Sequence, residues 1–302
     1  MPGAFAHLTL VETAMDPDVL IALPDFPSEA LDAVHFWYKF RQMGAVGPDY
    51  PYMTLVDKPS EKWAKVMHYD ATGSMVRAGV ERLRSLAGDD REKCLSWLFG
   101  YASHVVGDAT IHPIVYPYDD DKTLHRKQEM HQDVFIYKTL GFGEPWVSDI
   151  LKSGIKECGS VAGVDRHILS FWERILARTN QSLYSKVRPD INFWHSAFTE
   201  VIDAVDDFSR LPKLFRHLGM EKGVVYPLYE EIDPAYVKNI KTPTGPAMDY
   251  EDVFAKAVTN VREAWHKIVL GVYRGDGGYL TYFKDWNLDT GVDNATGKLT
   301  FW

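Results

Sequence analysis

The spacing of hydrophobic residues along the chain predicts helices through most of its length. Residues 28–43 carry apolar side chains at helical intervals, after Ser28 as the starting residue, and the pattern stops at Gly44. The same pattern recurs over further stretches: 60–87, with an interruption near Gly73, 90–117, 121–140, 146–158, 163–187, 190–210 and 249–273. We therefore predict an all-α protein of about seven to nine helices, a multi-helix bundle with a less regular C-terminal extension.

Glycine and proline mark the segments that should not form regular helices. Residues 44–53 (GAVGPDYPYM) should form a structured loop that holds Asp49 between two prolines. Prolines and a glycine break up 219–247, and the tail should be irregular or a short hairpin folded over the helices. We expect a helical domain over 1–215, with 216–302 packed on it as an extension rather than an independent domain.

Composition limits the function classes. A hydrophobic content of 46% with 25% charged residues is that of an ordinary globular protein, and no window approaches the roughly 18 apolar residues of a membrane span. A net charge of −9 without a basic run leaves no electrostatic footprint for a nucleic-acid duplex. The N-terminus lacks a basic segment, so we expect a cytoplasmic location or export without a cleaved signal peptide. Cys94 and Cys158 should be ordinary thiols.

The chemistry is concentrated between Gly100 and Glu129. His104, Asp108 and His112 are spaced by four residues, so one helix carries them past the same region on successive turns. His125 and Glu129 repeat this step on the next predicted helix. Imidazoles and carboxylates converging in this way are typical ligands of zinc and similar divalent ions. The alternative is that amphipathic helices collected these residues by chance.

Three more candidates precede this stretch: His7, Asp49 and His68. Taken alone, His7 is an incidental histidine near a terminus and Asp49 a turn-capping aspartate. Together with the five later residues, however, the series resembles the zinc-dependent phospholipase C and P1/S1 nuclease superfamily, which has an all-α fold with three zinc ions in a cleft. The resemblance covers about residues 1–210. Its most specific pieces are GPDYPY, GYASHVVGDATIHP and the pair His125 and Glu129.

The resemblance implies two to three zinc ions and a ligand set for each. The first zinc would be bound by two carboxylates and two imidazoles: Asp49, His68, His104 and Asp108. The second would be bound by His112, His125 and Glu129. The third would use His7, Asp108 as a bridging carboxylate, and the amino group and carbonyl of the first residue, which is Pro2 once Met1 is removed.

The same resemblance implies a phosphodiester hydrolase, most similar to phospholipase C. Asp49 and Asp108 would be its catalytic residues, with Asp49 orienting the attacking water or acting as base. Tyr50 matches an aromatic residue that contacts the lipid head group, although packing of its loop is the equal alternative. His131 and Asp133 are candidate hydrogen-bond partners for the ligand imidazoles.

Several features leave the substrate open. The eight-residue step from His104 to His112 resembles the glycosylphosphatidylinositol-specific phospholipase D branch, and residues 2–6 lack the acid that binds choline in the secreted phospholipases. A P1/S1-like nuclease or 3′-nucleotidase is the alternative function, although the acidic chain makes a nucleic-acid partner less favoured. A carboxylate-bridged di-metal oxygenase and a non-catalytic metal-binding protein are more remote. Aromatic residues of the tail either cover the cleft or pack the tail onto the helices: Tyr279, Tyr282, Phe283 and Trp286.

Overall fold

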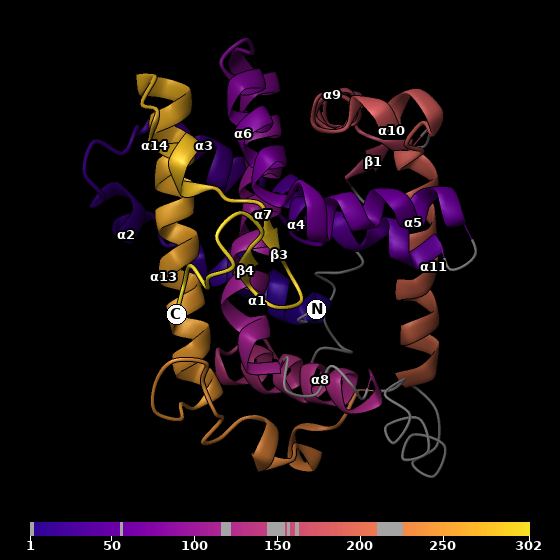
Figure 1. The fold of residues 1–302 in the computed structure, drawn as a ribbon, viewed down its shortest axis with the longest axis vertical. Coiled ribbons are helices and arrows are strands. Elements are labelled where there is room, and N and C mark those ends of the chain that lie inside the picture. Colours follow the sequence, from indigo (N-terminus) through magenta and orange to yellow (C-terminus); the bar gives the residue numbers. More distant parts are fainter. Residues whose placement is uncertain are drawn as a thin grey trace.

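The computed structural model describes residues 3–54, 57–115, 122–143, 155, 158–160, 163–209 and 226–302, most of them helical (Figure 1). The α-helices in these residues are α1 (Ala4–Ala14), α2 (Pro17–Ile21), α3 (Glu29–Phe36), α4 (Tyr38–Val46), α5 (Lys58–Lys65), α6 (Thr72–Leu83), α7 (Gly88–Val115), α8 (Lys122–Thr139), α9 (Arg166–Thr179), α10 (Gln181–Lys186), α11 (Ile191–Ser209), α13 (Tyr250–Val269) and α14 (Gly278–Tyr282). The all-α prediction is confirmed, although the described residues alone contain more helices than the seven to nine expected.

Shorter elements connect these helices. The 3₁₀-helices are η1 (Gly47–Thr54), η6 (Tyr229–Glu231) and η7 (Pro234–Tyr236), and the π-helical turns are η2 (Val66–Asp70) and η8 (Leu270–Arg274). Two antiparallel pairs of two-residue strands complete the described residues: β1 (Gly159–Ser160) with β2 (Gly163–Val164), and β3 (Trp286–Asn287) with β4 (Val292–Asp293). The helix predicted over 146–158 lies outside the described residues, apart from Ile155 and Cys158.

Helix α7 is the centre of the fold. Every side chain from Cys94 to Val115 is buried, and α4, α6 and α13 pack around the helix, with α13 running alongside it in Figure 1. Asp89 and Asp90 lie in its first turn, where the partial positive charge of a helix N-terminus favours carboxylates. Because α7 is surrounded by protein, its polar side chains need protein or metal partners, since water is excluded.

The crossing of α4 and α7 corrects the prediction for the first predicted helix. The chain breaks at Trp37, which separates α3 from α4, and α4 then continues through Gly44, where a stop was expected. Gly44 and Gly100 allow the two helices to approach closely. A Cβ on Gly44 would lie 2.1 Å from a backbone oxygen of α7, and one on Gly100 would lie 1.9 Å from a backbone oxygen of α4. Here glycine serves helix packing rather than helix termination.

The segment after α4 is more regular than predicted. Residues 44–53 form the last turn of α4 and most of η1, and Asp49 is buried in η1. The interruption expected near Gly73 lies slightly earlier, at η2 and Ala71, where the chain turns between α5 and α6. Its consequence is that His68 lies on a π-helical turn rather than on a regular helix.

The C-terminal part contributes directly to the core. Trp265 of α13 is fully buried, and its ring stacks on Phe99 of α7 with centroids 4.8 Å apart. Its indole N–H donates to the Phe99 carbonyl oxygen at 3.0 Å and to Ser103 Oγ at 2.9 Å. The predicted boundary between 215 and 216 lies outside the described residues, but α13 packs on α7 as a core helix.

The tail forms a short hairpin, one of the two predicted alternatives. In β3 and β4, Trp286 pairs with Asp293 and Asn287 with Val292. Tyr279, Phe283 and Trp286 are almost completely buried. These three aromatic residues therefore have the packing role that the sequence left open.

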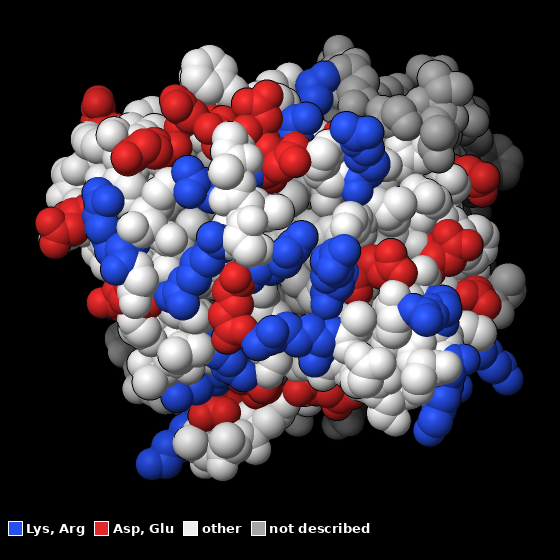
Figure 2. Space-filling view, turned by 90° about the horizontal axis from the view of Figure 1, so that it is seen from above, with Lys and Arg blue, Asp and Glu red and all other residues white. Residues whose placement is uncertain are grey.

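The surface charges are mixed at the end of the molecule that carries α6, α9 and α14. Figure 2 shows Lys and Arg side chains across this face with Asp and Glu side chains between them. Arg77 pairs with Asp285 at 3.2 Å, and Arg178 pairs with Glu81. Among the described residues, no helix is long and apolar enough to cross a bilayer. Cys94 and Cys158 are thiols that form no disulfide, as predicted, and both are buried.

Candidate metal centre

The structure brings all eight predicted side-chain ligands into three neighbouring groups. They come from α1, η1, η2, α7 and α8, and each is buried or nearly so. The four-residue spacing on α7 places His104, Asp108 and His112 on successive turns, as the sequence predicted. In each group, one ligand atom of every member lies within 4.8 Å of those of the other members.

The first group contains Asp49, His68 and His104. Asp49 Oδ1 lies 3.2 Å from Nε2 of His68 and 4.0 Å from Nε2 of His104. Both rings have no exposed surface, whereas Asp49 is 5% exposed. Asp49 is therefore the member of this group that has contact with solvent.

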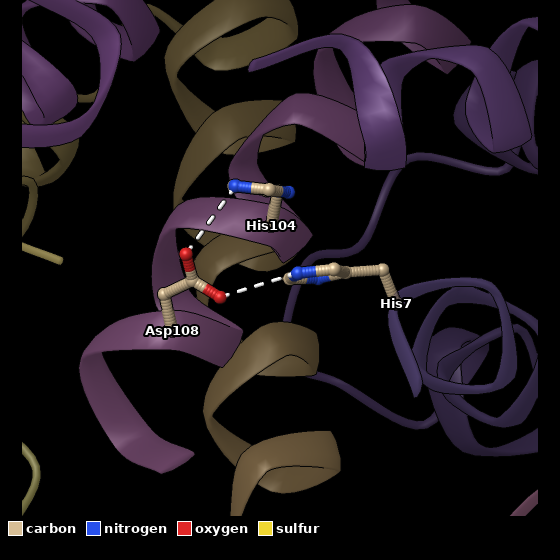
Figure 3. A group of neighbouring side chains, drawn as sticks. All are labelled: His7, His104 and Asp108. Atoms are coloured by element: carbon tan, nitrogen blue, oxygen red, sulfur yellow. Dashed lines mark ion pairs between the residues drawn. The ribbon is translucent and has the colours of Figure 1, made fainter. Parts of the chain in front are cut away.

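The second group contains His7, His104 and Asp108 (Figure 3). The two oxygens of Asp108 face different imidazoles: Oδ1 lies 3.2 Å from His7 Nε2, and Oδ2 lies 3.3 Å from His104 Nε2. The rings of His7 and His104 are stacked, with centroids 4.0 Å apart. His104 belongs to both the first and second groups, whereas Asp108, expected to serve both, is grouped only with His7 and His104; its two oxygens face these two different imidazoles.

The third group contains His112, His125 and Glu129. Glu129 Oε1 lies 3.2 Å from His112 Nε2 and 2.9 Å from His125 Nε2. His112 is fully buried, while Glu129 is 8% exposed and the His125 side chain 14% exposed. This group therefore also reaches the surface through its α8 members.

Backbone carbonyls fix the tautomer of three imidazoles. Nδ1–H of His68 donates to the Ala64 carbonyl oxygen at 2.8 Å, and Nδ1–H of His104 donates to that of Ala45 at 2.8 Å. Nδ1–H of His112 donates in the same way to Leu288. Because a carbonyl oxygen only accepts, Nδ1 must carry the proton in each ring, and a neutral ring then presents the lone pair of Nε2.

This tautomer is the observation that tests the fit to a metal. The Nε2 lone pairs face carboxylate oxygens at little more than 3 Å, an arrangement that repels unless a cation lies between them. Within the described part of the chain, Nε2 of His7, Nε2 of His104 and both oxygens of Asp108 are buried without a hydrogen-bond partner. Buried polar atoms of this kind are rare in folded proteins. Imidazole nitrogen and carboxylate oxygen are ligands that suit zinc, so the residues fit the ion.

The carboxylates of the site favour ionisation despite their burial. Burial alone would raise the pKa of Asp108, but the attraction of the His104 and His7 rings in their positively charged form outweighs this and holds it well below its usual value. The pKa of Asp49 is lowered in the same balance by His104 and His68. Carboxylates that stay charged are the form that binds a metal ion.

The start of α1 is held by a carboxylate of α8. Asp133 accepts hydrogen bonds from the Ala6 N–H at 2.9 Å, the Phe5 N–H at 3.3 Å and the Tyr226 hydroxyl at 3.0 Å. Burial raises the pKa of Asp133 to about 7, although these hydrogen bonds oppose the shift. The predicted ligand Pro2 lies outside the described residues. What the structure does show is that the start of α1, which follows it in the sequence, is held in place by Asp133.

For three of the candidate ligand imidazoles, the predicted hydrogen-bond partners His131 and Asp133 are not the partners found. Asp133 anchors α1, and His131 Nδ1 accepts from the Asp233 N–H at 3.0 Å, so neither supplies the Nδ1 partner of His68, His104 or His112. Backbone carbonyls fill this role, and a sequence pattern does not reveal them because every residue type has one.

Tyr50 lies away from solvent. Its ring has no exposed surface and packs on Phe198 with centroids 4.6 Å apart, and its hydroxyl lies 3.2 Å from His195 Nδ1. This is the packing alternative that the sequence left open. Tyr52 is only half-buried, and its ring lies 5.0 Å from that of His68. Burial, with the neighbouring carboxylates, raises the pKa of Tyr52 to about 12, so its hydroxyl stays protonated at neutral pH.

Fold and site together define a class: an all-α protein with three buried groups of His, Asp and Glu side chains that could hold metal ions. The sequence model of the zinc-dependent phospholipase C family matches residues 6–206, about two thirds of the chain. The chain therefore belongs to this family of zinc-dependent hydrolases. No curated protein and no solved structure matches the chain. The match includes every side-chain ligand described above and ends well before the β3–β4 hairpin.

Proposed function

We propose that this protein is a zinc-dependent phosphodiester hydrolase of the phospholipase C type, with a cluster of three zinc ions. The observation that carries the proposal is the convergence of three ligand groups whose Nε2 lone pairs face carboxylates. Bound zinc would lower the pKa of a water molecule to about 7 and neutralise charge that develops on the phosphate oxygens. The chain then needs no nucleophilic side chain of its own.

Asp49 and Asp108 have different roles in this proposal. Asp49 is the carboxylate of the first group that reaches the surface, so it is placed to orient a water molecule or accept its proton as well as bind metal. Asp108 has no exposed surface and directs its two oxygens to two different imidazoles, His7 and His104, and His104 also belongs to the first group, which suits a bridging ligand. Asp108 would therefore hold two metal ions and support catalysis through them.

The edge of the site favours a phosphate-containing substrate. Tyr52 is a half-buried residue whose ring lies beside that of His68, and its protonated hydroxyl can donate a hydrogen bond to a phosphate oxygen. A phospholipid or related phosphodiester is the substrate class that the family supports. The net charge of −9 gives a polynucleotide less electrostatic attraction to the chain.

Parallel assays of the zinc-loaded protein test the proposal. We expect diacylglycerol and a phosphorylated head group to be released from mixed phospholipid vesicles, with much slower hydrolysis of single-stranded DNA and 3′-nucleotides. Asp49→Ala, prepared in the same way, should lack this activity and controls for contaminating hydrolases. Preferential hydrolysis of DNA or 3′-nucleotides would instead assign the nuclease function. Protein with bound zinc that cleaves none of these substrates would contradict the hydrolase proposal.

A further inference from the structure

Leu288, at the turn of the β3–β4 hairpin, bridges two metal-site segments through its backbone groups. Its N–H donates to the carbonyl oxygen of His68 at 2.9 Å, and its own carbonyl accepts the hydrogen bond from Nδ1–H of His112. Leu288 is fully buried. A residue beyond the family match at 6–206 therefore contacts one candidate ligand from the first group and one from the third.

Gly291 places this turn directly against α7. Its φ is +70°, and a Cβ there would lie 2.5 Å from the Ala109 carbonyl oxygen and 2.7 Å from Pro113 Cγ. Because Pro113 has no N–H, the Ala109 carbonyl cannot make the usual helical hydrogen bond, and the Gly291 backbone closes over it. This contact lies on the stretch of α7 between Asp108 and His112.

The other side of the hairpin is fastened to η2 and the start of α6. The Trp286 N–H donates to Thr72 Oγ1 at 2.7 Å, and Thr72 Oγ1 donates back to the Trp286 carbonyl at 3.0 Å. The Asn294 side-chain amide donates to the Tyr69 carbonyl at 2.6 Å. In Figure 1 the hairpin lies over α7 in the middle of the molecule. It thus spans from the segment that carries His68 to the end of α7.

We infer that the β3–β4 hairpin is part of the metal centre, with Leu288 as a positioning residue for His112. Its carbonyl holds the His112 ring with Nε2 directed at Glu129 Oε1, 3.2 Å away. Loss of such a partner to a ligand histidine typically weakens metal binding by about 10- to 100-fold. The inference depends on the proposed function only in requiring that the site binds zinc.

Two glycine substitutions in the full-length chain test the inference. Gly291→Ala should displace the turn from α7 and lower the affinity for one zinc ion by about 10- to 100-fold. Competition with a chromophoric chelator measures this affinity. Gly297→Ala is the matched control, because Gly297 has a similar φ of +67° in the same region, but a Cβ added there would meet nothing within 4 Å. Both variants carry the same backbone strain, and only the first has the clash.

A second background identifies the affected ion. In a His125→Ala chain, which already lacks a ligand of the third group, Gly291→Ala should lower zinc content no further. If Gly291→Ala fails to fold, Asn287→Ala replaces it: that change removes the acceptor of the Asp289 N–H (3.0 Å) and loosens the turn without a clash. Asn287→Ala should lower the affinity for the same zinc ion.

The possible results separate this inference from the proposed function. Wild-type protein that binds no zinc would overturn the proposed function. Wild-type protein that binds two or more ions, together with Gly291→Ala or Asn287→Ala protein of unchanged zinc affinity, would overturn the inference alone. If Gly291→Ala lowered the binding of all zinc ions equally, with or without His125→Ala, the hairpin would have a general structural role. That result would also overturn the inference.

Discussion

Replacing Asp108 by Asn removes the charge of this carboxylate and preserves its shape. The two oxygens of Asp108 lie 3.2 and 3.3 Å from Nε2 of His7 and His104, and neither makes a hydrogen bond in the described structure. Asn offers one oxygen and an N–H₂ group that cannot bind a metal ion. We therefore expect the variant to lose the two zinc ions that share this carboxylate and nearly all activity.

The thermal effect should be large in the presence of zinc. At free zinc about 1,000-fold above the dissociation constant, each ion stabilises the native state by about 4 kcal/mol, so two ions contribute about 8 kcal/mol. A chain of 302 residues has an unfolding entropy of about 0.6 kcal/mol/K near its melting temperature. Because the Asn amide also stabilises the metal-free protein by about 1–3 kcal/mol, the net loss is about 5–7 kcal/mol, and the melting temperature of the Asp108→Asn protein should fall by about 8–11 °C.

Removal of zinc should reverse the sign of this effect. Without zinc, Asp108 is a buried charge that faces the Nε2 lone pair of His104 and the unpartnered Nε2 of His7. The Asn side-chain amide can donate to one of them, which should stabilise the metal-free protein by about 1–3 kcal/mol. Differential scanning calorimetry with zinc and with chelator measures the two changes in melting temperature. Atomic emission analysis measures the zinc content.

Asp165→Asn is the control for this experiment, because Asp165 caps α9 through the N–H groups of His167 and Ile168 and lies outside the three ligand groups. It should leave zinc content unchanged. Full zinc content and normal turnover in Asp108→Asn would refute the bridging role. A metal-free Asp108→Asn protein that melts below metal-free wild type would refute the claim that Asp108 faces unprotonated nitrogens.

Three further predictions concern pH, packing and the N-terminus. Because the pKa of Asp133 is raised from 3.8 to about 7 in the folded protein, the native state keeps a proton that the unfolded chain loses, so the free energy of unfolding should fall by up to about 4 kcal/mol between pH 4 and 7. In denaturant titrations, chelator-treated Asp133→Asn protein should lack this fall. The same pH dependence in both proteins would contradict the raised pKa of Asp133. Gly100→Ala should destabilise the protein by about 3 kcal/mol or prevent folding. Gly277→Ala, whose Cβ would meet nothing nearer than 3.9 Å, should change the denaturant midpoint little. Equal midpoints for the two variants would argue against close packing of α4 on α7. A short N-terminal tag should lower zinc content and activity more than a C-terminal tag at equal helicity by circular dichroism, and equal activities would exclude a terminal ligand.

The convergence of the candidate ligands was predictable because helix geometry converts sequence spacing into a shared face. His104, Asp108 and His112 needed only a helix to converge, and His125 with Glu129 needed a second one. His7, Asp49 and His68 are different, since they come from separate segments and no local pattern brings them together. Only the order of the whole series identified those three, and the structure places them within the same groups.

Backbone contacts account for what the sequence did not predict. Glycine often ends helices, so the pattern indicates a stop at Gly44, but the backbone of α7 lies too close at that point for any side chain. Tyr50 follows a ligand in a Pro-rich segment, which favours an accessible position, yet it is buried against Phe198. Close approaches depend on the packing of distant segments, which the residue types along one element do not specify.

The metal site and the fold depend on each other because the imidazoles are fixed before any ion binds. The carbonyls that hold His68, His104 and His112 belong to α5, α4 and the β3–β4 hairpin, so displacing any of these segments would reorient a ligand. Such preorganisation favours tight binding, since little side-chain entropy remains to be lost. It also leaves buried carboxylates facing lone pairs in the metal-free chain, which destabilises that state. Zinc binding should therefore act as folding free energy, coupling the C-terminal hairpin to the helices that carry the ligands.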